Sequence, residues 1–115
     1  TFVQIGLGEN HLNNVINLTG STTFREAVAL VERSELFLAT ESGLVHAATA
    51  VDTKSIVIIT GYQSKKMVSY PQNINIDISS HGPCGLKIPC NSCELDAKNH
   101  DFMEIVKITK ESLCL

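Results

Sequence analysis

Residues 36–50 read LFLATESGLVHAATA, and this stretch predicts a strand that runs directly into a helix. The apolar run 36–39 is typical of a short buried strand, and the alanine-rich pattern that follows is typical of a helix. Ser42 stands where an N-cap residue is expected, and Gly43 lets another molecule approach the backbone. Because the first turn of a helix has free N–H groups, this junction predicts a binding site for a phosphate group.

The rest of the chain repeats this alternation of apolar strands and amphipathic helices, which predicts an α/β, Rossmann-like fold with a parallel sheet flanked by helices. We expect strands at residues 2–6, 15–18, 36–39, 55–59 and 74–78, and helices at residues 23–33, 43–51 and 101–113. Residues 23–26, TFRE, predict a capping box, and residues 101–104, DFME, have the same pattern. The helical spacing predicts that these side chains face the core: Phe24, Val28, Leu30, Val31, Phe102, Ile105, Val106 and Leu113.

Composition limits the size of the fold and its partners. With 115 residues, 43% of them hydrophobic, the chain predicts a single domain over residues 1–115. The net charge of −3 and the dispersed basic residues argue against nucleic-acid binding by bulk electrostatics. The chain has no apolar run of the roughly 18 residues needed for a membrane span and no signal-peptide pattern at its start, which predicts a cytoplasmic protein. It starts in a strand without an initiator Met, which predicts a piece of a longer protein that is truncated at its N-terminus.

Ligands of open parallel sheets bind beyond the carboxyl ends of the strands, where we expect loops 6–10, 40–46 and 60–64 to converge. Glu41 would repel a neighbouring phosphate unless its carboxylate binds something else. Its partner is either a sugar or ribose hydroxyl or a set of backbone N–H groups. His46 is either a packed, hydrogen-bonded residue or a ligand contact.

Three segments resemble a known enzyme family. Residues 18–27, LTGSTTFREA, residues 41–50, ESGLVHAATA, and the buried strand that ends before Gly61 resemble the C-terminal, donor-binding lobe of the family 9 glycosyltransferases. These are the ADP-heptose heptosyltransferases of lipopolysaccharide assembly and relatives that modify autotransporters. The resemblance covers residues 2–110 and implies a GT-B architecture with a nucleotide-sugar donor, an ADP-sugar in the best-known members, and no further cofactor.

The resemblance assigns these positions to donor binding: Glu9, Glu41, Ser42, Gly43, Leu44, Val45 and His46. It implies that Ser42 and the three backbone groups after it hold the diphosphate, and that Glu9 lies near the ribose. Glu41 replaces the usual aspartate, and the loop after Gly61 lacks a common Pro-Thr pair, which leaves Tyr62 and Gln63 without a family role.

The family's acceptor site and its aspartate base lie in an N-terminal lobe. This chain alone is therefore expected to be inactive, and the acceptor is expected to be a glycan, a lipid-linked glycan or a protein. The resemblance also allows a peripheral position of the full-length protein at the inner membrane.

Residues 84–93, CGLKIPCNSC, with His81 and His100 nearby, form a separate candidate site. These side chains could bind one zinc or iron ion, Cys84 could form a disulfide with Cys90 or Cys93, or all three thiols could be free. Cys114 is expected at a helix end.

Three functional classes therefore remain open. The first is the donor-binding lobe of a glycosyltransferase that acts on a bacterial surface glycan or glycoprotein. The second is a non-catalytic nucleotide- or phosphate-binding domain. The third is a metal-stabilised interaction module built on the cysteine segment.

Overall fold

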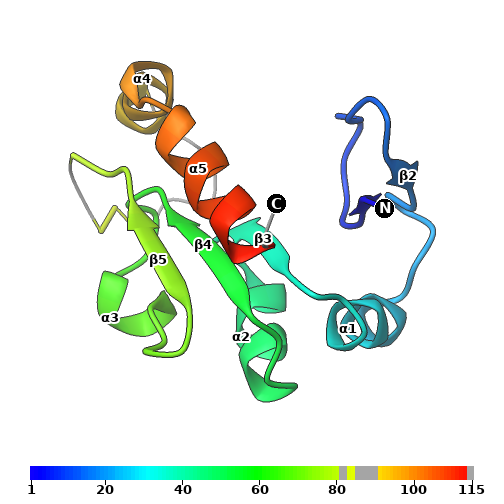
Figure 1. Ribbon diagram of the computed structural model, residues 1–115. Coiled ribbons are helices and arrows are strands. Elements are labelled where there is room, and N and C mark those ends of the chain that lie inside the picture. Colours follow the sequence, from blue (N-terminus) through cyan, green and yellow to red (C-terminus); the bar gives the residue numbers. More distant parts are fainter. Residues whose placement is uncertain (81–82, 85–90, 114–115) are drawn as a thin grey trace.

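The computed structural model describes residues 1–80, 83–84 and 91–113, and it has an α/β architecture with parallel strands flanked by helices (Figure 1). In chain order the elements are β1 (Val3–Gln4), β2 (Ile16–Asn17), α1 (Phe24–Glu32), β3 (Phe37–Thr40), α2 (Gly43–Ala50), β4 (Ser55–Ile59), α3 (Lys65–Val68), β5 (Ile74–Asp77), α4 (Asn91–Asn99) and α5 (Met103–Ser112). This arrangement confirms the predicted fold class.

The strands are divided between two sheets. β3, β4 and β5 form one sheet in that order, β1 pairs with β2 in the other, and every pair is parallel. The backbone ladder of the smaller sheet extends beyond its two-residue strands, since carbonyl groups within residues 2–6 accept hydrogen bonds of 2.9 Å from residues 16–20. The sequence indicated a parallel sheet but not its division into two.

β4 lies at the centre of the larger sheet and is buried on both faces, as its continuous apolar sequence predicts. Val57 and Ile59 pack against α2 and α3 on one face. Ile56 packs against α5 on the opposite face, together with Ile76 of β5. The alternation of side chains along one strand therefore holds helices on both sides of the sheet.

Helix α1 begins as predicted, but its buried face was predicted only in part. Thr23 accepts a hydrogen bond from the Glu26 N–H, and the Glu26 side chain accepts one from the Thr23 N–H, which confirms the capping box. Val31 is buried, and Phe24 and Leu30 are instead 62% and 36% exposed. The buried stripe passes through Ala27 and Val31, four residues apart, so Leu30 lies to one side of it and Phe24 projects from the first turn.

The predicted C-terminal helix exists, but its start and its buried face differ from the prediction. Its N-cap residue is Phe102, which makes no side-chain cap bond. The predicted capping box does not form, and the Asp101 carboxylate instead accepts a hydrogen bond from the Met103 N–H. Ile105 is buried, whereas Phe102 and Val106 are exposed. Val106 lies at an open apolar groove of about 310 Å³ beside β3, whose lining residues are Phe2, Leu38, Ile105, Val106, Thr109, Lys110 and Leu113.

Helices α3 and α4 were not predicted. α3 has only four residues, and α4 has a polar sequence, so neither carries the apolar periodicity on which the predictions rested. Within residues 1–80, 83–84 and 91–113, no helix has the length and hydropathy needed to cross a membrane.

Candidate functional site

The N-terminus of α2 has no side-chain cap. Ser42 is its N-cap residue and has extended backbone angles, but the Ser42 hydroxyl makes no cap hydrogen bond. Gly43 and Leu44 are the first two helical residues, and their N–H groups have no partner within the helix. Val45 differs, because its N–H donates to the Ser42 carbonyl at 3.1 Å and its side chain is fully buried. The groups that remain for an anion are the Ser42 hydroxyl and the first two N–H groups.

Gly43 has free space beside its Cα atom. An added Cβ would lie 3.9 Å from Cε2 of Phe24, which is an ordinary van der Waals distance, and its φ is not in the left-handed region. The glycine is therefore required neither by backbone strain nor by crowding within the described structure. This leaves the approach of a ligand as a reason for its presence.

Glu41 joins the ends of two neighbouring strands. Its Oε2 accepts from the Thr60 N–H at 2.7 Å. Its Oε1 accepts from the Thr60 hydroxyl and the Tyr62 N–H, both at 2.9 Å, and from the Gln63 N–H at 3.4 Å. Of the two partners that the sequence left open for this carboxylate, the structure shows the backbone groups.

The loop after β4 can wrap around this carboxylate because of Gly61. Its φ is +90°, a conformation that residues with side chains rarely adopt, and it turns the chain between Thr60 and Tyr62. The Gly61 carbonyl accepts from the Cys84 N–H at 3.1 Å. The cysteine segment thus begins directly against the candidate site.

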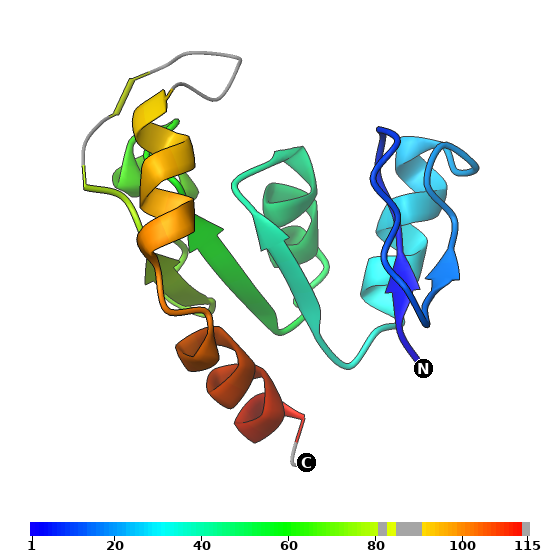
Figure 2. The same ribbon diagram turned by 90° about the horizontal axis from the view of Figure 1, so that it is seen from above.

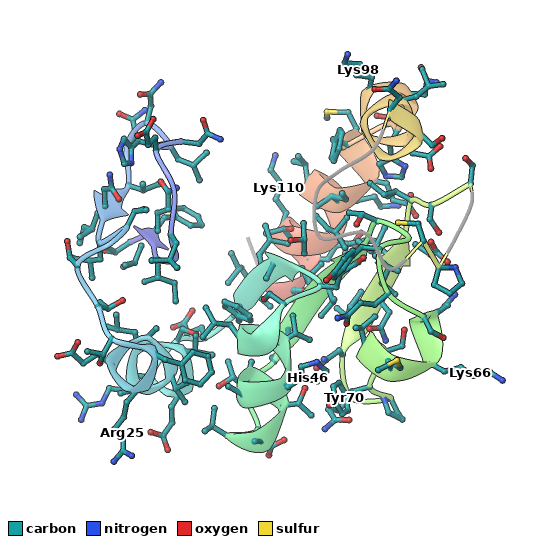
Figure 3. The ribbon with its side chains drawn as sticks, turned by 180° about the vertical axis from the view of Figure 1, so that it is seen from behind. Arg25, His46, Lys66, Tyr70, Lys98 and Lys110 are labelled. Carbon is teal, nitrogen blue, oxygen red and sulfur yellow. The ribbon has the colours of Figure 1, made fainter. Side chains whose placement is uncertain are left out.

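His46 is exposed, and its side chain meets Tyr70 from the segment between α3 and β5. Nδ1 of His46 and the Tyr70 hydroxyl are 2.6 Å apart, and the two rings form an edge-to-face pair with centroids separated by 5.7 Å. Figure 3 shows the two side chains pointing toward one another. This is the packed, hydrogen-bonded state that the sequence left open beside ligand contact, and Nε2 is not part of the bond.

Lys65 and Lys66, which begin α3 after the loop that follows β4, are oriented differently from one another. Lys65 forms an ion pair with Asp77 at 3.6 Å, whereas Lys66 is exposed and points away from the molecule (Figure 3). Burial raises the pKa of Asp77, but the Ser79 hydroxyl and N–H, followed by Lys65, outweigh it and hold the pKa below its ordinary value. Lys65 is therefore engaged in the fold.

Glu9 lies in the loop after β1, in the smaller sheet, and is exposed. Figure 2 shows that the loop after β1 and the loop between β3 and α2 emerge on the same edge of the molecule. Glu41 bonds the loop after β4 directly, whereas Glu9 belongs to the loop after β1. The predicted residues 41–46 thus lie together at the start of α2, and Glu9 stands apart from them.

The cysteine site lies largely outside the described residues. His81, Cys90 and Cys114 are not among them, and neither is the side chain of Cys93. Cys84 is partly buried and has no disulfide partner among the described residues. The part of the chain that the structure describes contains no group of three metal-ligating side chains, and the metal and disulfide hypotheses depend on residues beyond it.

Two contributions to this edge were not predicted from the sequence. Tyr70 lies 24 residues after His46, and no motif links the two positions. Thr60 follows a buried strand, so its loop was among the predicted ligand loops, but its role as a donor to Glu41 had no sequence signal.

The sequence model of glycosyltransferase family 9 (heptosyltransferase) matches residues 7–93, which is more than half of the chain. Neither a curated protein nor a solved structure matches the chain. The matched region includes β2 to β5, the open N-terminus of α2 and the loop that holds Glu41.

Proposed function

Because this chain belongs to glycosyltransferase family 9, we propose that it forms the donor-binding part of a glycosyltransferase, with the donor diphosphate at the N-terminus of α2. In this proposal the enzyme is heptosyltransferase-like and has a GT-B architecture. Its donor is a nucleotide-diphosphate sugar, with ADP as the favoured nucleotide. The acceptor is a bacterial surface glycan, a lipid-linked glycan or a glycoprotein, and transfer takes place in the cytoplasm.

The observation that carries the proposal is the difference between two helix N-termini. In α1 the capping box of Thr23 and Glu26 fills the first turn. In α2 the N-cap hydroxyl of Ser42 makes no such bond. A helix without a cap keeps unpaired N–H donors and the positive end of its dipole, and a diphosphate satisfies both.

These groups would act on the leaving group of the transfer. When the bond between the sugar and the diphosphate breaks, negative charge grows on the departing phosphate oxygen. The Ser42 hydroxyl and the N–H groups of Gly43 and Leu44 would donate hydrogen bonds to it, and fixed donors of this kind stabilise a developing charge more effectively than water does. We assign no base to these residues, so activation of the acceptor hydroxyl belongs to other groups of the enzyme.

The test is an NMR titration of the ¹⁵N-labelled chain with ADP, UDP, GDP and inorganic phosphate. We expect shifts centred on the amides of residues 42–46 and a preference for one nucleoside diphosphate. Ser42→Ala removes a hydrogen bond to a charged group and should weaken binding by about tenfold. Thr23→Ala, the same kind of change at the closed N-terminus of α1, is the matched control and should leave binding unchanged.

Failure of all four compounds to shift these amides at millimolar concentration would contradict the proposal for this chain. Equal responses to all four would favour the second candidate, a general phosphate-binding domain. That candidate gains some support from Glu41, which stands in place of the usual aspartate and is hydrogen-bonded within its own chain.

A further inference from the structure

The carboxylate of Glu41 is held by donors from its own chain. It accepts hydrogen bonds from the Thr60 N–H, the Thr60 hydroxyl, the Tyr62 N–H and, at a longer distance, the Gln63 N–H. An ionised carboxylate has about four lone-pair sites for such bonds. Oε1 accepts three of these bonds and Oε2 accepts one, so among the described contacts only the second lone pair of Oε2 is open to a sugar or ribose hydroxyl.

We propose that Glu41 is a positioning residue of the phosphate site, which ties the loop after β4 to the start of α2 and contacts no part of the ligand. The inference rests on the proposed function for the identity of the site. It gives Tyr62 and Gln63 a role as well, since their backbone N–H groups hold the carboxylate.

The sheet register explains why a glutamate is needed. Thr40 pairs with Ile58, so Glu41 is level with Ile59, the last residue of β4, and its first donor is Thr60, one residue beyond the end of that strand. Neighbouring strands are about 4.8 Å apart, and the side chain must span this distance and advance beyond it. An aspartate would be shorter by one carbon–carbon bond, about 1.5 Å.

The loop is shaped to receive an anion. The left-handed Gly61 lets the N–H groups on either side of it point at one carboxylate, in the manner of the backbone concavities that bind anions elsewhere. Glu41 directly precedes Ser42 and Gly43, so a fixed carboxylate also fixes the peptide groups that begin α2. The N–H groups proposed to bind phosphate are thereby held before any ligand arrives.

Glu41→Gln in the 115-residue chain tests this inference, with pyrophosphate and ADP as the two probes. Without ligand, the Tyr62 and Gln63 amides should exchange with solvent about tenfold faster than in the wild type, because an amide side chain holds them less well. Affinity for both probes should fall by the same factor, about threefold or more. Loss of a nearby negative charge by itself would strengthen anion binding, so a shared weakening reports lost positioning.

Glu35→Gln is the matched control, because it removes the same charge from an exposed residue before β3. Thr60→Val removes only one donor and serves as the second variant if Glu41→Gln does not fold; it should weaken both probes equally, though by less. Weakened ADP binding with unchanged pyrophosphate binding would overturn the inference, since it would show a hydroxyl contact. Unchanged exchange of the Tyr62 and Gln63 amides would overturn it too.

The two proposals can fail separately. If the wild-type chain binds neither pyrophosphate nor ADP, the proposed function fails, while amide exchange in the free protein still reports whether Glu41 holds the loop. If the wild type binds both probes and Glu41→Gln weakens only ADP, the function stands and the positioning role fails.

Discussion

Glu41 and Ser42 are neighbours in the chain, but their side chains meet different surroundings. The carboxylate of Glu41 is satisfied by the loop after β4, and the hydroxyl of Ser42 caps nothing. At the scale of single residues, the site therefore consists of one side chain that is committed to the fold and one that remains available. His46 is both engaged in the fold and accessible, since its Nδ1 is hydrogen-bonded to the Tyr70 hydroxyl and the residue remains exposed.

Gly43→Ala separates binding from stability. Its new Cβ would meet only Cε2 of Phe24 at 3.9 Å, so we expect the free energy of unfolding to stay the same or to rise by up to about 1 kcal/mol, because alanine favours a helix. The methyl group would obstruct the approach of a phosphate, and binding should weaken by about tenfold. Urea unfolding and the ADP titration measure the two effects. A marked loss of stability would show that Gly43 is needed by the fold itself.

Among the helices, α1 has a side-chain cap at its first turn and α2 does not. The capping box of α1 lowers the pKa of Glu26 below its ordinary value of 4.5. The main cause is the hydrogen bond from the Thr23 N–H to the ionised carboxylate, followed by the one from the Thr23 hydroxyl. The first turn of α2 has no side-chain cap bond. The sequence predicted where both helices begin, because the capping box at residues 23–26 and the Ser-Gly pair at residues 42–43 are signals that lie within a few residues of each helix start.

The lowered pKa of Glu26 predicts an acid-sensitive contribution to stability. A carboxyl group whose pKa is lower in the folded state than in the unfolded state stabilises the fold at every pH above its unfolded-state pKa. This contribution is lost as the pH falls through its folded-state pKa. The stability difference between wild type and Glu26→Ala should therefore be constant near neutral pH and shrink as the pH falls below the ordinary pKa of 4.5. Urea unfolding across pH 3 to 7 measures it, with Glu32→Ala at the end of the same helix as control. A difference that stays constant to pH 3 would count against the ionised capping box.

At the scale of the whole molecule, the two sheets differ in how firmly they are held. β4 is hydrogen-bonded to a strand on each side and packs on helices on both faces, whereas β1 and β2, among the described strands, pair only with each other over a short ladder and leave Val3 and Ile16 about half exposed. Figure 1 shows β2 and the N-terminus well apart from β4 and β5.

This difference predicts a hierarchy of amide hydrogen exchange. The amides of β4 should be the slowest to exchange, since they open only when the core opens, and those of Ile16 and Leu18 should exchange by local opening, about a hundredfold faster or more. Exchange followed by NMR measures both groups in one sample. Equal rates in the two sheets would show that they unfold as one unit.

The sequence by itself determined the α/β class, the parallel strands, the start of α1 and the start of α2 after Ser42, whereas the structure showed that the Ser42 hydroxyl makes no cap bond. These features depend on periodicity and on capping chemistry, which act within a few residues. Only the tertiary structure decided that Glu41 holds the loop after β4, 19 to 22 residues away, and that Tyr70 meets His46. The exposure of Phe24 and the division of the strands into two sheets were decided there as well, because such partners depend on which elements pack together, and a local pattern does not record that.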